Sequence, residues 1–86
     1  MILFINPNSS AHMTESIVAA AREALPGVAI EGWTNAEGPV AIQGADDGEA
    51  AVPGLLALLP AAQAAGARAI VIACFDDTGL AEARAA

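Results

Sequence analysis

The residue best suited to chemistry in this sequence is a single thiol at position 74. Cys74, the only cysteine, follows the apolar run 69–73 and precedes the polar stretch 75–79. The apolar run is short and rich in β-branched side chains, which favours a buried parallel strand. Because Gly79 starts a new helix, the thiol lies where a strand meets a helix. In an α/β sheet that edge is where ligands bind.

A second junction of the same kind carries hydrogen-bonding groups. The apolar segment 2–5 is followed by the turn pattern Asn6-Pro7-Asn8-Ser9-Ser10 and then by a helical pattern. Asn8, Ser9 and Ser10 offer amide and hydroxyl donors, and the start of the helix offers free backbone N–H groups. Such donors suit a carboxylate or an imide oxygen.

Hydrophobic periodicity predicts the elements that position these two junctions. The expected strands are 2–5, 28–33 and 69–73, and the expected helices are 11–25, 46–65 and 80–86. Pro53-Gly54 predicts a break or a kink in the second helix. Because strands alternate with helices, we expect a parallel sheet with right-handed crossovers.

The predicted fold is a flavodoxin-like three-layer α/β sandwich with strand order 2-1-3. In that order the first and third strands are neighbours, so Cys74 and the loop 6–10 meet at the switch point of the sheet. Residues 1–86 form one partial α/β domain in this interpretation. The domain looks incomplete because three strands make a small sheet and the last helix has only about two turns.

Each junction taken alone has a structural explanation. A cysteine at the end of a buried strand is most often a small inert apolar residue. The loop 6–10 is most often only a turn with a helix cap, and Asp77 is expected to cap the last helix. The convergence of the two junctions at one edge is what favours a functional site.

Composition excludes several classes of partner and site. A net charge of −7 with only three basic residues leaves no basic patch for nucleic acid or an anionic membrane. One cysteine and one histidine give neither a disulfide nor metal-ligand spacing, and no cofactor is indicated. With no signal-peptide pattern and no apolar stretch long enough to span a bilayer, we expect a cytoplasmic protein.

Four segments of the sequence occur in the order typical of one enzyme family. They are residues 5–10 with Met13-Thr14, Gly38-Pro39 with 42–44, residues 51–55, and residues 71–80, of which the last is the most specific. On these segments the chain resembles the aspartate/glutamate racemase superfamily, and within it the hydantoin and allantoin racemase group. The resemblance covers nearly the whole chain and implies racemisation without a cofactor.

In the enzymes that the chain resembles, two cysteines flank the carbon that carries the acidic hydrogen. One cysteine removes the proton as a thiolate, and the other returns a proton to the opposite face. By position, Cys74 corresponds to the first cysteine. The resemblance also implies that a hydantoin, allantoin or related carboxylate or imide is bound by Asn8, Ser9, Ser10, Phe75 and Asp76.

The sequence departs from this family pattern in two ways. It holds one cysteine, so the second proton-transfer group is not among these 86 residues. We therefore expect the chain alone to be inactive and to need a second half or a homo-oligomer. Thr78 stands where a proline is common, a mild change that should leave the helix start intact.

Other functions stay open at this point. A maleate isomerase of the same superfamily uses the same cysteine as a nucleophile on a double bond. Arylmalonate decarboxylases generally lack a cysteine at this position, so Cys74 disfavours them. A flavodoxin-like module that binds an anion, or has no catalytic role, would carry an unreactive Cys74.

Overall fold

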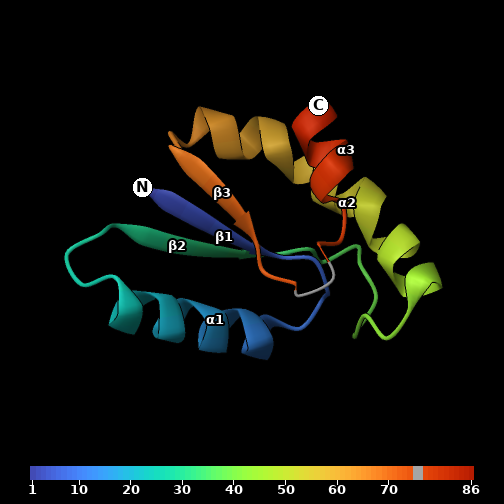
Figure 1. Ribbon diagram of the computed structural model, residues 1–86, viewed down its shortest axis with the longest axis horizontal. Coiled ribbons are helices and arrows are strands. Elements are labelled where there is room, and N and C mark those ends of the chain that lie inside the picture. The colour runs from blue at the N-terminus through green and yellow to red at the C-terminus, as the bar shows by residue number, and fades with distance from the viewer. Residues whose placement is uncertain (75–76) are drawn as a thin grey trace.

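The computed structural model describes residues 1–74 and 77–86 and contains a three-stranded sheet with helices on both faces (Figure 1). In chain order the elements are β1 (Ile2–Asn6), α1 (Ala11–Ala24), β2 (Ile30–Thr34), α2 (Ala45–Ala64), β3 (Ala69–Ile72) and α3 (Leu80–Ala85). The predicted alternation of strands and helices is confirmed. No helix in the described part of the chain is long and apolar enough to cross a membrane.

The strand order is β2-β1-β3 and all pairings are parallel, which confirms the predicted order 2-1-3. β1 is the central strand. Ile2 is opposite Ile30 in β2 and Ala69 in β3, and the pairing runs in register toward Asn6. The carboxyl ends of the three strands therefore lie at one edge of the sheet, and the segments after β1 and β3 leave it side by side.

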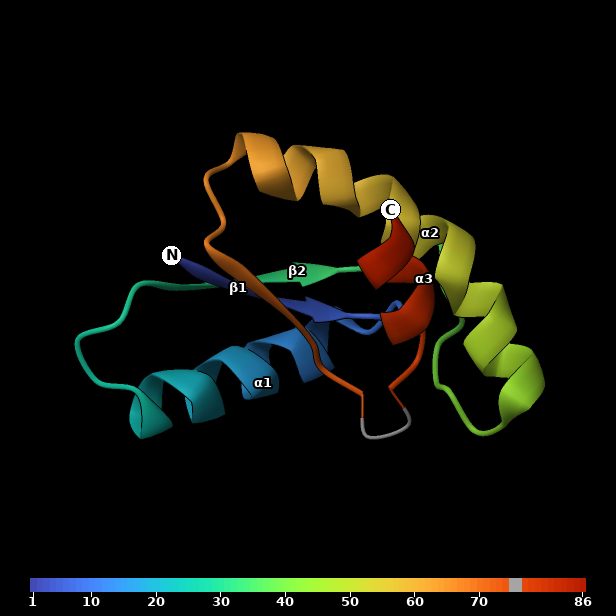
Figure 2. The same ribbon diagram turned by 45° about the horizontal axis from the view of Figure 1, so that its top comes forward.

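The buried core lies between the sheet and α2. Leu3 and Ile5 of β1 are fully buried, and they pack with Leu55 and Ala62 of α2. Because side chains alternate along a strand, Leu3 and Ile5 point to the same face. α1 covers the opposite face, and α3 packs against α2 (Figure 2).

The face that α1 turns toward the sheet differs from the apolar face that helical spacing predicts for residues 11–25, which is Ile17, Ala20, Ala21, Ala24 and Leu25. Thr14 and Ala21 are the buried residues of the helix, and Val18 lies so close to Gly32 of β2 that a Cβ there would overlap it. Of the residues predicted to form the buried face, only Ala21 is buried; the others are Ile17, Ala20, Ala24 and Leu25. On the face that packs against the sheet, the Thr14 hydroxyl lies 2.7 Å from the Thr34 hydroxyl of β2, and either can donate.

α2 is one helix rather than two pieces. Pro53 and Pro60 both lie within its 20 residues, and both are exposed. The ribbon changes direction along its length in Figures 1 and 2, as prolines on the solvent side of a helix favour. The predicted kink is therefore present without a break.

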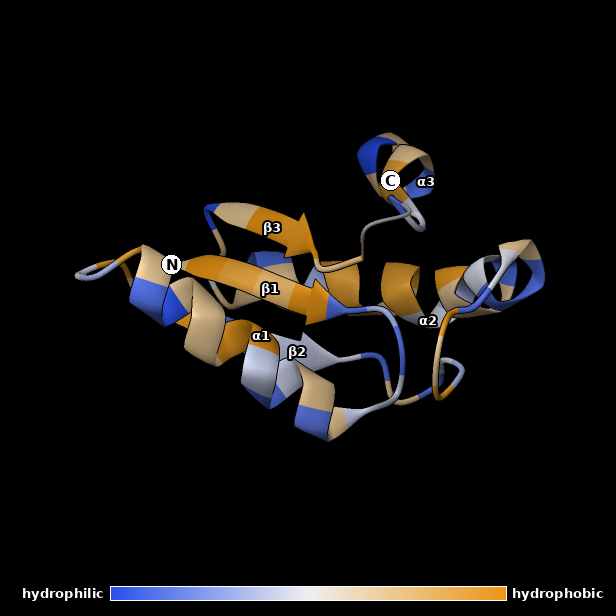
Figure 3. Cartoon of the chain, turned by 60° about the horizontal axis from the view of Figure 1, so that its bottom comes forward, coloured by the Kyte–Doolittle hydropathy of each residue, from blue (hydrophilic) through white to orange (hydrophobic). Residues whose placement is uncertain are grey.

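The prediction that the strand before Cys74 is buried is wrong. β3 lies at the edge of the sheet, and Ile70 and Val71 are 38% and 39% exposed. Figure 3 shows β3 as apolar as the central strand β1. The apolar composition of the run is typical of a buried strand. In the structure, however, β3 pairs only with β1, and α3 packs against α2 rather than against β3.

Candidate active site

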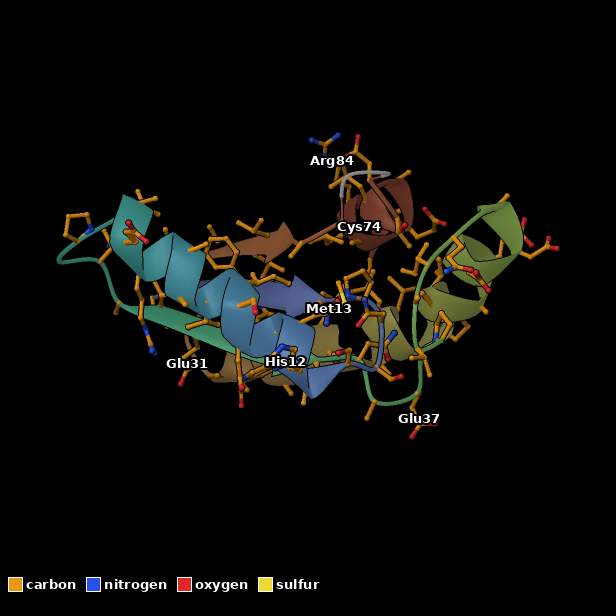
Figure 4. The ribbon with its side chains drawn as sticks, turned by 90° about the horizontal axis from the view of Figure 1, so that it is seen from below. His12, Met13, Glu31, Glu37, Cys74 and Arg84 are labelled. Atoms are coloured by element: carbon orange, nitrogen blue, oxygen red, sulfur yellow. The ribbon has the colours of Figure 1, made fainter. Side chains whose placement is uncertain are left out.

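The structure brings Cys74 and Asn8 to one cavity of about 360 Å³ at the carboxyl edge of the sheet. Figure 4 views the molecule with Cys74 and Met13 labelled. The walls come from the loop after β1, the start of α1, the loop before α2 and the end of β3: Asn6, Pro7, Asn8, Met13, Ile17, Ala41, Ile42, Ala73 and Cys74. None of these described side chains is charged, so this part of the cavity suits a small ligand that can accept hydrogen bonds.

Asn6 holds Asn8 in place. Asn6 is 1% exposed, and its Nδ2 donates to Asn8 Oδ1 at 2.7 Å while its Oδ1 accepts from the Asn8 N–H at 3.2 Å. Asn8 Oδ1 also accepts from the Ser10 N–H at 2.9 Å. Within the described residues, Asn8 Nδ2 has only the Met13 Sδ as an acceptor, at 3.5 Å. That amide therefore retains donor capacity at the cavity wall.

Asn6 is itself anchored to α1 and β2 through Thr14. Asn6 Nδ2 lies 3.2 Å from Thr14 Oγ1, and Thr14 Oγ1 is 2.7 Å from Thr34 Oγ1. The sequence pattern predicted a turn at Asn6 and placed Thr14 near the start of the helix, but it predicted no contact between them. The available signal was a polar residue at the end of an apolar strand directly before a proline, which predicts a buried, hydrogen-bonded amide.

Asn35 ties the same loop to α2. It is 1% exposed, and its Nδ2 donates to the carbonyl oxygens of Pro7 and Ala51, each at 2.9 Å. Gly54 makes room for it, because a Cβ at that position would overlap Asn35 Oδ1. Asn35 lies in a segment that the sequence predicted only as a loop, so its bridging role was missed.

Ser9 and Ser10 lie beside the cavity and are not among its lining residues. Ser10 Oγ accepts from the Met13 N–H at 3.3 Å and caps α1, and the Ser9 N–H donates to the Pro39 carbonyl at 2.8 Å. Their predicted contacts with substrate stay predictions. Phe75 and Asp76, also predicted to line the pocket, lie outside the described residues.

Replacing Ser10 by alanine is expected to lower the free energy of unfolding by about 1 kcal/mol, because the Met13 N–H loses its acceptor. Urea denaturation followed by circular dichroism measures this. Ser16→Ala is the matched control, since Ser16 is exposed within α1; it should change stability by less than about 0.5 kcal/mol. Equal losses in the two variants would contradict the capping role.

Cys74 is half-buried, and its Sγ lies 3.2 Å from Thr78 Oγ1. Its carbonyl oxygen accepts from the Asp77 N–H at 3.2 Å. The prediction that Asp77 caps α3 is wrong. Gly79, with φ 72°, occupies the cap position, and Asp77 contributes only its carbonyl oxygen to the Leu80 N–H.

The chain is similar to known racemases over nearly its whole length. A family model described as Asp/Glu/hydantoin racemase matches residues 2–86. A hydantoin racemase of Rhizobium meliloti is 42% identical in an alignment 86 residues long, and the alignment covers 96% of the chain and 35% of that relative. A hydantoin racemase of Paenarthrobacter aurescens is 40% identical over 81 residues, which cover 92% of the chain and 34% of that relative.

The fold has a solved counterpart as well. The allantoin racemase from Klebsiella pneumoniae matches with a TM-score of 0.89 and 43% sequence identity, over 96% of the chain and 34% of that structure. The chain therefore spans about a third of the length of these relatives.

Proposed function

Because the chain belongs to the Asp/Glu/hydantoin racemase family, we propose that it supplies one side of a racemase site for hydantoin- or allantoin-like substrates. The observation that carries the proposal is the single cavity shared by Cys74 and Asn8. This cavity combines one thiol with one amide donor between apolar walls. A five-membered imide ring carries an acidic C–H, which a thiol can deprotonate, and carbonyl oxygens, which an amide can bind.

Cys74 is the proposed acid–base group for one face of the substrate. As a thiolate it takes the proton from the ring carbon, and the electron pair left behind delocalises onto the neighbouring carbonyl oxygen. A thiol on the opposite face then donates a proton to that carbon. The two proton transfers balance without any change of oxidation state, so this chemistry needs no cofactor.

The loop after β1 is proposed to hold the substrate's oxygen atoms. Asn8 Nδ2 has donor capacity beside the cavity, and a donor aimed at the developing enolate oxygen stabilises the intermediate. We assign further substrate contacts to Ser9, Ser10, Phe75 and Asp76 on the family resemblance. A reducing compartment such as the cytoplasm fits the requirement for a free thiol.

The second proton-transfer group is proposed to come from outside these 86 residues, because the sequence holds one cysteine. The chain alone should therefore leave the optical rotation of one enantiomer of a 5-substituted hydantoin unchanged at neutral pH. The chain grafted in place of the matched third of the Rhizobium meliloti racemase should racemise it. We call this fusion the graft.

The two proteins are compared by optical rotation at equal concentration, with buffer alone as the control for spontaneous racemisation. Racemisation by the chain alone, abolished in Cys74→Ala, would show that the 86 residues are sufficient and would contradict the division of the site. A folded graft with no activity would contradict the proposed function.

A further inference from the structure

Thr78 is placed to act on the sulfur of Cys74. Thr78 is 7% exposed, and its Oγ1 lies 3.2 Å from Cys74 Sγ. Among the described residues, that sulfur is the only hydrogen-bond partner of the hydroxyl. A buried hydroxyl without a partner is unfavourable, so the pair is expected to persist in solution.

The backbone on both sides of Thr78 fixes this position. Asp77 and Gly79, on either side of Thr78, both have positive φ, 53° and 72°, so the backbone there is neither regular helix nor strand. A Cβ at Gly79 would overlap the Leu55 side chain, which means that the turn is pressed against α2. The backbone of α2 also approaches Thr78, because a Cβ at Gly48 would lie 3.8 Å from Thr78 Oγ1. These contacts with α2 confine the segment that carries Thr78, whose hydroxyl lies at the sulfur.

We propose that Thr78 is a positioning residue for Cys74, whose hydroxyl donates a hydrogen bond to the sulfur whenever Cys74 is a thiolate. The inference rests on the proposed acid–base role of Cys74. A thiolate has no proton to donate, so in that state the hydroxyl must be the donor, and hydrogen bonds to a charged acceptor are the stronger ones. When Cys74 carries the proton, the hydroxyl accepts instead, and the contact is kept through both proton transfers.

Among the described residues, no positively charged side chain lines the cavity at the sulfur or the hollow beside Thr78. The cavity wall facing the sulfur has no charged residue from β1, α1 or the loop before α2. Asp77 precedes Thr78, and Glu49 of α2 and Glu82 of α3 line the hollow on its other side. Arg68 and Arg84 line a different hollow beside β3.

The test is the rate of alkylation of the 86-residue chain by iodoacetamide, measured from pH 6 to pH 10. Thr78→Val keeps the shape and loses the hydroxyl, so it should react about fivefold more slowly at pH 7. Thr78→Ser keeps the hydroxyl and should react within about twofold of the parent at every pH. At pH 10, which is well above the ordinary pKa of a cysteine thiol, the rates should agree within about twofold.

A rate for Thr78→Val equal to that of the parent at pH 7 would overturn the inference. So would a rate lowered by the same factor at every pH, because that result would mean restricted access to the sulfur. If urea denaturation shows that Thr78→Val is unfolded, Thr78→Ala replaces it. The graft's activity judges the racemase proposal separately, so an inactive graft with the expected alkylation profile rejects that proposal alone.

Discussion

Replacing Cys74 by alanine in the graft is expected to slow racemisation by about 10³-fold, because general acid–base catalysis on one face of the ring carbon is lost. Cys74 is the only thiol contributed by this chain, and the cavity that it lines holds no other acid or base among the described residues. No other described residue of the cavity wall can therefore take over the proton. The initial rate of change in optical rotation, starting from each enantiomer, measures the loss.

Cys74→Ser and Ser16→Ala are the companion variants. Serine keeps the size of the side chain but is a far weaker acid, so its loss should approach that of alanine. Ser16 is exposed on α1 and is absent from the cavity wall, so its variant should keep the graft's rate. A Cys74→Ala rate within tenfold of the parent graft would mean that another group carries the proton.

Replacing Asn35 by alanine is expected to lower the free energy of unfolding of the chain by about 2–4 kcal/mol. The carbonyl oxygens of Pro7 and Ala51 would each lose the Asn35 amide as a donor in a buried place. The loss is a large part of the stability of a small domain, which is about 5–15 kcal/mol. Urea denaturation followed by circular dichroism gives the value.

Gln43→Ala serves as the control for Asn35→Ala, since it removes an amide of similar chemistry from an exposed position. It should change stability by less than about 0.5 kcal/mol. A loss below 1 kcal/mol for Asn35→Ala would mean that water satisfies both carbonyl oxygens. The bridge would then contribute little to holding the loop after β1 against α2.

The parts of the fold that depend on local pattern were predictable from the sequence. The apolar runs before Asn6 and Cys74 predict strands, and their alternation with helices predicts a parallel sheet. The order 2-1-3 then brings the two strand ends together, so the sequence predicts Asn8 and Cys74 at one edge, where the structure has them. The family resemblance rests on segments that include both of these strand ends.

The parts that depend on tertiary contacts were not predictable. The sequence around Asn35 contains no sign that Pro7 and Ala51 lie beside it, because those contacts span three elements. The exposure of β3 depends on what lies beyond it in the sheet, which its apolar composition does not reveal. The contact between the Thr78 hydroxyl and Cys74 depends on the backbone conformation near Thr78, which the sequence pattern does not reveal.

The most direct test of the proposed role of Cys74 is deuterium incorporation at the ring carbon in D₂O, measured by mass spectrometry for each hydantoin enantiomer separately. Cys74 is proposed to serve one face only, so the graft carrying Cys74→Ala should lose exchange for one enantiomer and keep measurable exchange for the other. Exchange of both enantiomers at the rates of the unaltered graft would contradict the assignment of Cys74 as the acid–base group of this site.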